Sequence, residues 1–172
     1  MRKTSPTVVV FASMLSQSAC DASSNLLTNV VHEVSECGGF STAASALLAE
    51  STAEDDSYEC VESLTWSYIP DTQSLTVTDT CVSLNCCGDR SMRLDCDESG
   101  CVAHETDTAQ RGKGRCSCDC DFDFRVTGSP VRSGPLSLTV MRYEEDEYFG
   151  NHLDTIWTGI IDLRDGSGTL DR

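Results

Sequence analysis

From Tyr58 onward, hydrophobic and polar residues alternate with a period of two. SLTWSYI at 63–69 and SLTVTDT at 74–80 flank the turn-like stretch PDTQ, and SMRLDC at 91–96 and CVAHETD at 101–107 flank DESG. Successive side chains of a strand point to opposite faces, so this alternation is typical of half-buried strands. The pattern predicts two β-hairpins.

The same alternation continues to the C-terminus, interrupted by glycine, proline and aspartate at the turns. Further strands are expected within CVSLNC at 81–86, RCSCDCDFDFRVTG at 115–128, PLSLTVMRYEE at 135–145 and DTIWTGIIDLRD at 154–165. About eight short strands predict an all-β fold, an antiparallel β-sandwich that is immunoglobulin-like or related. We place this one domain at residues 58–172.

The segment before the domain has a different composition, rich in alanine and serine. Hydrophobic residues recur at helical spacing from Leu26 to Val34, and Gly38-Gly39 would end that helix. Ser41 could begin a second short helix that runs to Leu48. Residues 20–57 are therefore expected to be either partly helical or a flexible tether.

The first nineteen residues predict a secretory signal peptide. Arg2 and Lys3 precede an apolar run from Val8 to Leu15, and the small residues Ser18 and Ala19 follow. The run is shorter than the ~20 apolar residues that a membrane-spanning helix needs.

The end of this signal resembles the lipobox of bacterial lipoproteins, in which cleavage precedes a cysteine that is then lipidated. Ser18, Ala19 and Cys20 match the pattern, whereas Gln17 stands where a leucine, valine or isoleucine is usual. The resemblance implies that Cys20 is the lipidated N-terminus and that the chain is exported and anchored to a membrane of the cell envelope. The alternative is an ordinary signal cleaved after Ala19, with Cys20 a structural cysteine.

The cysteine count favours the lipoprotein. There are 11 cysteines, and an odd number leaves one unpaired in an oxidising compartment. If Cys20 carries the lipid, ten remain for five disulfides: Cys37, Cys60, Cys81, Cys86, Cys87, Cys96, Cys101, Cys116, Cys118 and Cys120.

Three of these cysteines alternate in CSCDC. On an extended strand Cys116, Cys118 and Cys120 would share one face at intervals of about 6.6–6.8 Å. That spacing disfavours bonds among the three, and it disfavours one zinc ion, whose sulfurs all lie at about 2.3 Å. We therefore expect disulfides and no metal, with a thiolate site for copper(I) or zinc as the alternative.

Two pairings are predicted. Cys96 and Cys101 bracket the DESG turn, and a Cys37–Cys60 bridge would tie the N-terminal segment to the first strand. The remaining six cysteines would join 81, 86 and 87 to 116, 118 and 120 in an order that the spacing leaves open. Each disulfide would add ~2–4 kcal/mol of stability.

The arrangement of NCC at 85–87, CSCDCDFDF at 116–124 and PLSLTV at 135–140 resembles a group of small cysteine-rich secreted bacterial β-sandwich lipoproteins of unknown function. Gly88 stands where that group commonly has proline, and Ser117 where it commonly has an acid. The resemblance implies a disulfide-stapled sandwich outside the bacterial cell and implies no catalytic activity.

Charge restricts the partners. The formal net charge is −16, and loss of residues 1–19 would remove two basic residues, Arg2 and Lys3, and no acidic one. A chain this acidic is repelled by nucleic acid and by anionic lipid, so membrane contact is expected through the N-terminal lipid only.

Candidate chemistry is sparse. Asp119, Asp121 and Asp123 would share one strand face, which cannot wrap around one calcium ion, so a solvated acidic face is the simpler reading. His32, His104 and His152 fit no zinc-protease or nucleophile-elbow motif, and none of the ten cysteines forms C-x-x-C. We predict no cofactor and no enzymatic activity.

The expected function is that of a lipid-anchored extracytoplasmic module for binding, adhesion or envelope structure. A small envelope hydrolase or thiol-redox enzyme and a thiolate metal-binding protein are the alternatives. The stretch YEEDEYFGNH, from Tyr143 to His152, is the candidate contact for a protein or glycan partner, because it is unlike a strand.

Overall fold

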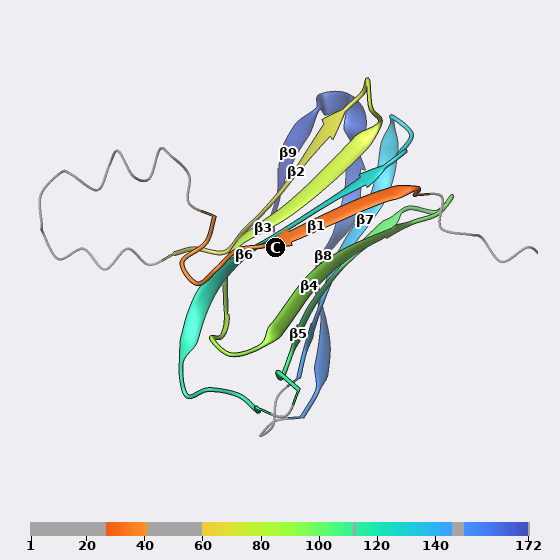
Figure 1. Ribbon diagram of the computed structural model, residues 1–172. Coiled ribbons are helices and arrows are strands. Elements are labelled where there is room, and N and C mark those ends of the chain that lie inside the picture. The colour runs from red at the N-terminus through yellow and green to blue at the C-terminus, as the bar shows by residue number, and fades with distance from the viewer. Residues whose placement is uncertain (1–26, 41–59, 112, 146–149, 172) are drawn as a thin grey trace, which may run out of the picture.

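The chain folds into a two-layered β-sandwich. The computed structural model describes residues 27–40, 60–111, 113–145 and 150–171. One layer has five strands in the order β1 (Asn29–Val34), β6 (Asp119–Ser129), β3 (Ser74–Asn85), β2 (Ser63–Ile69) and β9 (Ser167–Leu170). The other layer has four, in the order β4 (Asp89–Cys96), β5 (Cys101–Thr108), β7 (Pro135–Glu144) and β8 (His152–Asp162). Figure 1 shows the two layers facing each other, and the all-β sandwich predicted from the alternation is confirmed.

Six of the seven strand pairings are antiparallel, and the exception is the pairing of β5 with β7. The chain leaves β5, crosses to the other sheet as β6 and returns as β7, so the β5–β7 pair is parallel. The inward side chains of both sheets form one core, in which Leu75, Val77, Phe124, Leu138 and Val140 are fully buried. Burial of this apolar surface is the main favourable term in folding.

Strand β3 is longer than expected and contains a bulge. The stretch 81–86, predicted as a separate strand, continues β3, and the register with β6 shifts between Asp79 and Val82. Cys81 lies in this bulge with a positive φ of 62°. A bulge bends a strand and reorients its side chains, and here it directs Cys81 toward Cys60.

The N-terminal segment differs from the prediction. Residues 29–34 form strand β1 at the edge of the five-stranded sheet instead of a helix, and all six pair with β6. The valines of this stretch favour a strand, and the free edge of β6 supplies the hydrogen-bonding partner that an isolated segment lacks. The second expected helix, from Ser41 to Leu48, lies outside the described residues.

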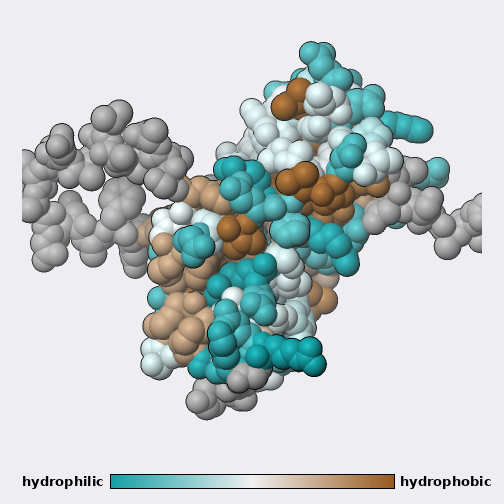
Figure 2. Space-filling view, in the orientation of Figure 1, coloured by the Kyte–Doolittle hydropathy of each residue, from teal (hydrophilic) through white to brown (hydrophobic). Residues whose placement is uncertain are grey.

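The surface drawn in Figure 2 is mostly hydrophilic or neutral, with small brown areas of hydrophobic residues. Six large hydrophobic side chains are exposed in the described part of the chain: Val30, Val31, Val61, Ile69, Leu153 and Ile160. Single exposed apolar side chains are normal on protein surfaces and need no special explanation. Nowhere in the described ranges is there a helix with the length and hydrophobicity to cross a bilayer.

Candidate functional site

All ten cysteines after Cys20 form disulfides. Cys96 pairs with Cys101 across the β4–β5 turn, as predicted. The predicted Cys37–Cys60 bridge is wrong, because Cys37 pairs with Cys120 and Cys60 with Cys81. Strand β1 runs alongside β6 and brings Cys37 to the start of that strand, a placement that neither a helix nor a flexible tether had indicated.

The two remaining bridges join the same two short segments. Cys86 pairs with Cys118 and Cys87 with Cys116, at Cα–Cα distances of 5.6 and 5.3 Å. The expected long strand is shorter than predicted, since β6 begins at Asp119 and the residues from 115 to 118 form no strand. The three alternating cysteines therefore do not share one flat strand face, although none of them bonds to another.

Asn85, the last residue of β3, holds these two segments together through its side chain. Its Oδ1 accepts hydrogen bonds from the backbone N–H of Cys87 at 3.0 Å and of Cys116 at 3.1 Å. Its Nδ2 donates to the carbonyl oxygen of Cys116 at 2.6 Å, and the backbone N–H of Cys86 donates to the carbonyl of Cys118 at 2.9 Å. The four cysteines are thus held in place by hydrogen bonds as well as by their two disulfides.

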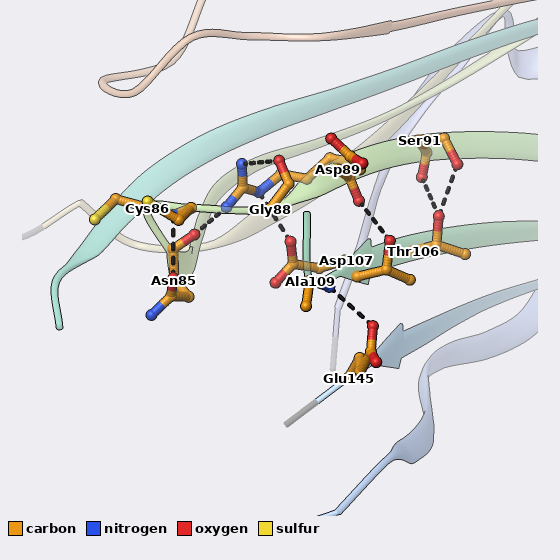
Figure 3. A network of polar contacts seen from close by, with 12 residues as sticks. Asn85, Cys86, Gly88, Asp89, Ser91, Thr106, Asp107, Ala109 and Glu145 are labelled. Carbon is orange, nitrogen blue, oxygen red and sulfur yellow. Dashed lines mark hydrogen bonds and ion pairs between the residues drawn. The ribbon is translucent and has the colours of Figure 1, made fainter. Parts of the chain in front are cut away.

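A buried ionic cluster lies beside this double bridge. Arg115 Nη1 donates to Asp107 Oδ2 at 2.7 Å, and Arg90 Nε lies 3.2 Å from Asp107 Oδ1. The same two arginines donate to the backbone carbonyls of Cys87 and Asn85. Figure 3 shows Asn85, at the end of β3, and Asp107, near the end of β5, close to Gly88 in the connection between β3 and β4, so the cluster is continuous with the cysteine segments.

The packing at position 88 is so close that a larger residue would displace its neighbours. A Cβ there would lie 2.4 Å from Asp107 Oδ1 and 2.7 Å from Arg115 Nη1. Burial raises the pKa of Asp107, and the attraction of Arg90 and Arg115 opposes that rise. Burial also lowers the pKa of Arg90.

A second ionic cluster lies between the sheets. Arg142 of β7 donates to Glu105 of β5 at 2.7 Å, to Asp79 of β3 at 2.6 Å and to Glu62 at 2.8 Å. Asp79 and Glu105 are only 0% and 1% exposed. One guanidinium therefore faces three carboxyl groups, which it cannot neutralise if all three are ionised.

A proton on Asp79 reduces the negative charge of this cluster. Burial, together with repulsion by Glu105, raises the pKa of Asp79 to about 9, against the attraction of Arg142. Burial also raises the pKa of Glu105. A proton on Asp79 would let this side chain donate a hydrogen bond to the carboxylate of Glu105, and the interaction of the two carboxyl groups raises the pKa of Asp79. Burial alone would lower the pKa of Arg142, but its carboxyl partners, Glu105 first, raise it.

The predicted solvated face of three aspartates is wrong at one position. Asp119 is exposed and Asp121 half-buried, whereas Asp123 is buried to 9% exposure. The Asp123 carboxylate accepts hydrogen bonds from the backbone N–H groups of Phe40 at 2.7 Å and Cys81 at 2.9 Å. It connects the segment after β1 to the β3 bulge, which is a structural role.

The histidines lie apart from both clusters. His104 is on the outer face of β5, with Nε2 3.7 Å from the carboxylate of Asp95. Burial, and then repulsion by Arg93, lowers its pKa, against the attraction of Asp95. His32 and His152 are exposed on β1 and β8.

Two open grooves flank the Cys96–Cys101 bridge. One, of about 590 Å³, lies on the outer face of β4, β5 and β7 and is lined in part by Arg93, His104 and Thr139. The other, of about 660 Å³, is lined in part by Gln73, Val131 and Leu136. Asp97 in the adjoining turn accepts bonds from Ser99 and Gly100, and the bonds from Ser99 lower its pKa.

The remaining positions are two aromatic residues, Cys20 and the candidate partner stretch. Trp66 and Tyr68 are core residues, and the Tyr68 hydroxyl donates to the carbonyl of Val131 at 2.8 Å. Cys20 lies outside the described residues. So do residues 146–149 of the candidate partner stretch, while its ends belong to β7 and β8.

The sequence analysis missed the buried charges, although the alternation contains a signal for them. Asp79 is an even number of residues from Leu75 and Val77 along β3, so it lies on the same inward face. In the same way, Glu105 and Asp107 lie on the inward face of β5 with Cys101 and Ala103. Arg142 likewise follows Leu138 and Val140 on β7. A charged residue at an inward position of a strand marks a buried ionic group.

Comparison with known proteins assigns no relationship. No family model, no curated protein and no solved structure matches this chain.

Proposed function

We propose that the protein is an exported binding or envelope-structural module, anchored to a membrane by lipid on Cys20 and without catalytic activity. Its resemblance to small cysteine-rich bacterial lipoproteins forms part of this proposal. The folded sandwich would be displayed from the anchor, with its open grooves as the places where a protein or glycan partner lies.

The disulfide framework is the observation that carries the proposal. Five bridges involve every cysteine between residues 37 and 120. Such bonds persist outside the reducing cytosol, so they support an oxidising, extracytoplasmic environment. With ten cysteines paired, Cys20 is the cysteine left over, as a lipid attachment site requires.

The placement of charged groups supports a non-catalytic role. Asp79, Glu105 and Arg142 are each held by partners in the core, and none of them lines either groove. A general acid or base must reach the proton that it transfers. We therefore assign these titratable groups a stabilising role and no contact with a substrate.

The decisive experiment is the substitution Cys20→Ser in the full chain expressed in a bacterial host. We expect the variant to leave the membrane fraction or to remain unprocessed, because the anchoring lipid needs the cysteine sulfur. Ser18→Ala is the matched control, since it keeps a small residue before the cleavage site, and its membrane attachment should be unchanged.

Intact-mass measurement of the mature wild-type protein gives a second readout. The expected mass is that of the chain from Cys20, plus acyl groups, minus ten hydrogens for five disulfides. A Cys20→Ser protein that is processed and bound to the membrane like wild type would refute the lipid anchor.

A further inference from the structure

We propose that Cys86, Cys87, Cys116 and Cys118 form a redox-controlled site for one thiophilic metal ion, of which zinc is the probe. The site would assemble when a dithiol reductant opens the Cys86–Cys118 and Cys87–Cys116 bridges. This proposal is independent of the lipid anchor, because it concerns only the folded domain.

The positions of the sulfur atoms carry the inference. The Sγ atoms of Cys86, Cys116 and Cys118 all lie within 4.8 Å of one another. Cys87 Sγ lies outside this group but is bonded to that of Cys116, so it would move toward the other two sulfurs once that bridge opens. A zinc ion with four sulfurs at about 2.3 Å has sulfur–sulfur separations of about 3.8 Å. No other group of three potential metal ligands is this compact in the described part of the chain.

Hydrogen bonds would hold the four residues in place after reduction. The Asn85 side chain binds the backbone of Cys87 and Cys116, and the Cys86 N–H binds the Cys118 carbonyl. None of these bonds involves a sulfur. The thiols would therefore remain adjacent, and a preorganised set of ligands costs less entropy to assemble around an ion.

Two cations would favour the thiolate forms. Arg90 donates to the Asn85 carbonyl and Arg115 to the Cys87 carbonyl, so both guanidiniums adjoin the cysteine segments. Four thiolates around Zn²⁺ carry a net charge of −2, which neighbouring arginines partly offset. Cys118 is exposed, which gives a reductant and a metal ion access.

The chemistry balances in two stages. Each disulfide takes two electrons and two protons from one dithiol, so two dithiols become two cyclic disulfides and four cysteine thiols form. Binding of Zn²⁺ then displaces the four thiol protons and forms four Zn–S bonds. Removal of the metal and reoxidation would restore the two bridges.

The test uses the full chain, reduced with a dithiol under native conditions and freed of reductant in the absence of oxygen. We expect one equivalent of Zn²⁺ to bind per chain and Co²⁺ to show sulfur-to-cobalt charge-transfer absorption. Circular dichroism should show β-structure in the metal-loaded protein. Absence of stoichiometric binding, or binding to a chain without β-structure, would overturn the proposal.

Substitutions locate the ion. Cys86→Ser combined with Cys118→Ser should abolish stoichiometric binding, whereas Cys60→Ser combined with Cys81→Ser, which also removes one bridge, should retain it. Equal binding by both double variants would place the metal elsewhere and refute the site.

Alkylation of the reduced wild-type chain keeps the test decisive if a variant does not fold. With zinc present, Cys86, Cys87, Cys116 and Cys118 should be protected while the other cysteines react. Uniform alkylation would contradict the proposal.

Asn85 is a positioning residue in this scheme. Asn85→Ala removes the clamp but no sulfur, and we expect zinc affinity to fall 10- to 100-fold, as for other residues that orient metal ligands. Asn85→Asp keeps the acceptor oxygen for the Cys87 and Cys116 N–H groups and should restore part of that affinity. Unchanged affinity in Asn85→Ala would show that the hydrogen bonds do not organise the site.

Discussion

The two buried ionic clusters share strand β5 but are opposite in composition. Glu105 and Asp107 are two residues apart on its inward face. Glu105 belongs to a group of three carboxyl side chains around Arg142. Asp107 belongs to a group with two guanidiniums, those of Arg90 and Arg115.

The difference shows how an acidic chain accommodates charge between its sheets. In the Arg142 cluster the carboxyl group of Asp79 holds a proton. The cluster therefore carries less negative charge than three ionised carboxylates around one guanidinium would give it. In the Asp107 cluster the excess positive charge is spread over backbone carbonyls, including that of Glu145, which accepts from Arg115. Buried ions need such compensation, because their desolvation costs several kcal/mol each.

Loss of the central cation should have the largest effect. Arg142→Met would leave Glu105 and Glu62 without their counter-ion in a buried site, and we expect a loss of roughly 3–5 kcal/mol in the free energy of unfolding. Urea denaturation at pH 7 measures this loss. Arg164→Met, which removes an exposed ion pair with Asp162, is the control and should leave the midpoint almost unchanged. A small effect in both variants would show that the cluster does not stabilise the fold.

The proton on Asp79 predicts an unusual dependence of stability on pH. Its pKa of about 9 in the folded protein exceeds the ordinary value of 3.8, so the folded state retains a proton that the unfolded state releases. The contribution of Asp79 to stability is therefore complete below pH 4 and is lost as the pH rises toward 9.

Asp79→Asn should remove this dependence, because an amide can also donate to Glu105 and accept from Arg142. The difference in stability between variant and wild type should change by up to roughly 1.4 kcal/mol per pH unit between those limits, in favour of the variant at higher pH. Thermal or urea unfolding from pH 4 to pH 9 gives the curve. A difference that is independent of pH would mean that Asp79 is ionised in the folded protein.

Removal of the central anion in the base-rich cluster should have a moderate effect. Asp107→Asn keeps the shape but removes the carboxylate that Arg90 and Arg115 share, and we expect a loss of about 2 kcal/mol in the free energy of unfolding. Carbonyl acceptors remain for both arginines, so the loss should be smaller than for Arg142→Met. Urea denaturation of the two variants side by side tests this order, and the reverse order would contradict the comparison.

The smallest effect is expected outside both clusters. His104→Gln changes a partly exposed side chain on the outer face of β5, whose carboxylate contact with Asp95 is 3.7 Å long. Surface changes of this kind fall within about 0.5 kcal/mol. Urea unfolding at pH 7 checks it, and a loss comparable to that of Asp107→Asn would show that the outer groove, and not the buried charge, limits stability.

Local pattern alone determined most strands of the fold. The period of two predicted both ends of the strand at 63–69 correctly, and it predicted the strand at 101–107 to within one residue. It could do so because inward and outward side chains alternate along any strand with one buried face. The Cys96–Cys101 bridge also followed from the sequence, since a tight turn brings its flanking residues together. The abundance of cysteine indicated both a disulfide framework and export, because disulfides persist in oxidising compartments outside the cytosol.

Contacts between distant residues were decided only in the tertiary structure. Strand β1 forms because β6 offers a free edge, and Cys37 reaches Cys120 as a result, 83 residues away. The bulge that directs Cys81 to Cys60, and the meeting of Asp79, Glu105 and Arg142 from three strands, depend on the registers of both sheets. Alternation specifies which face a side chain occupies, but the partner that it meets is set by how the strands pair and how the two sheets pack.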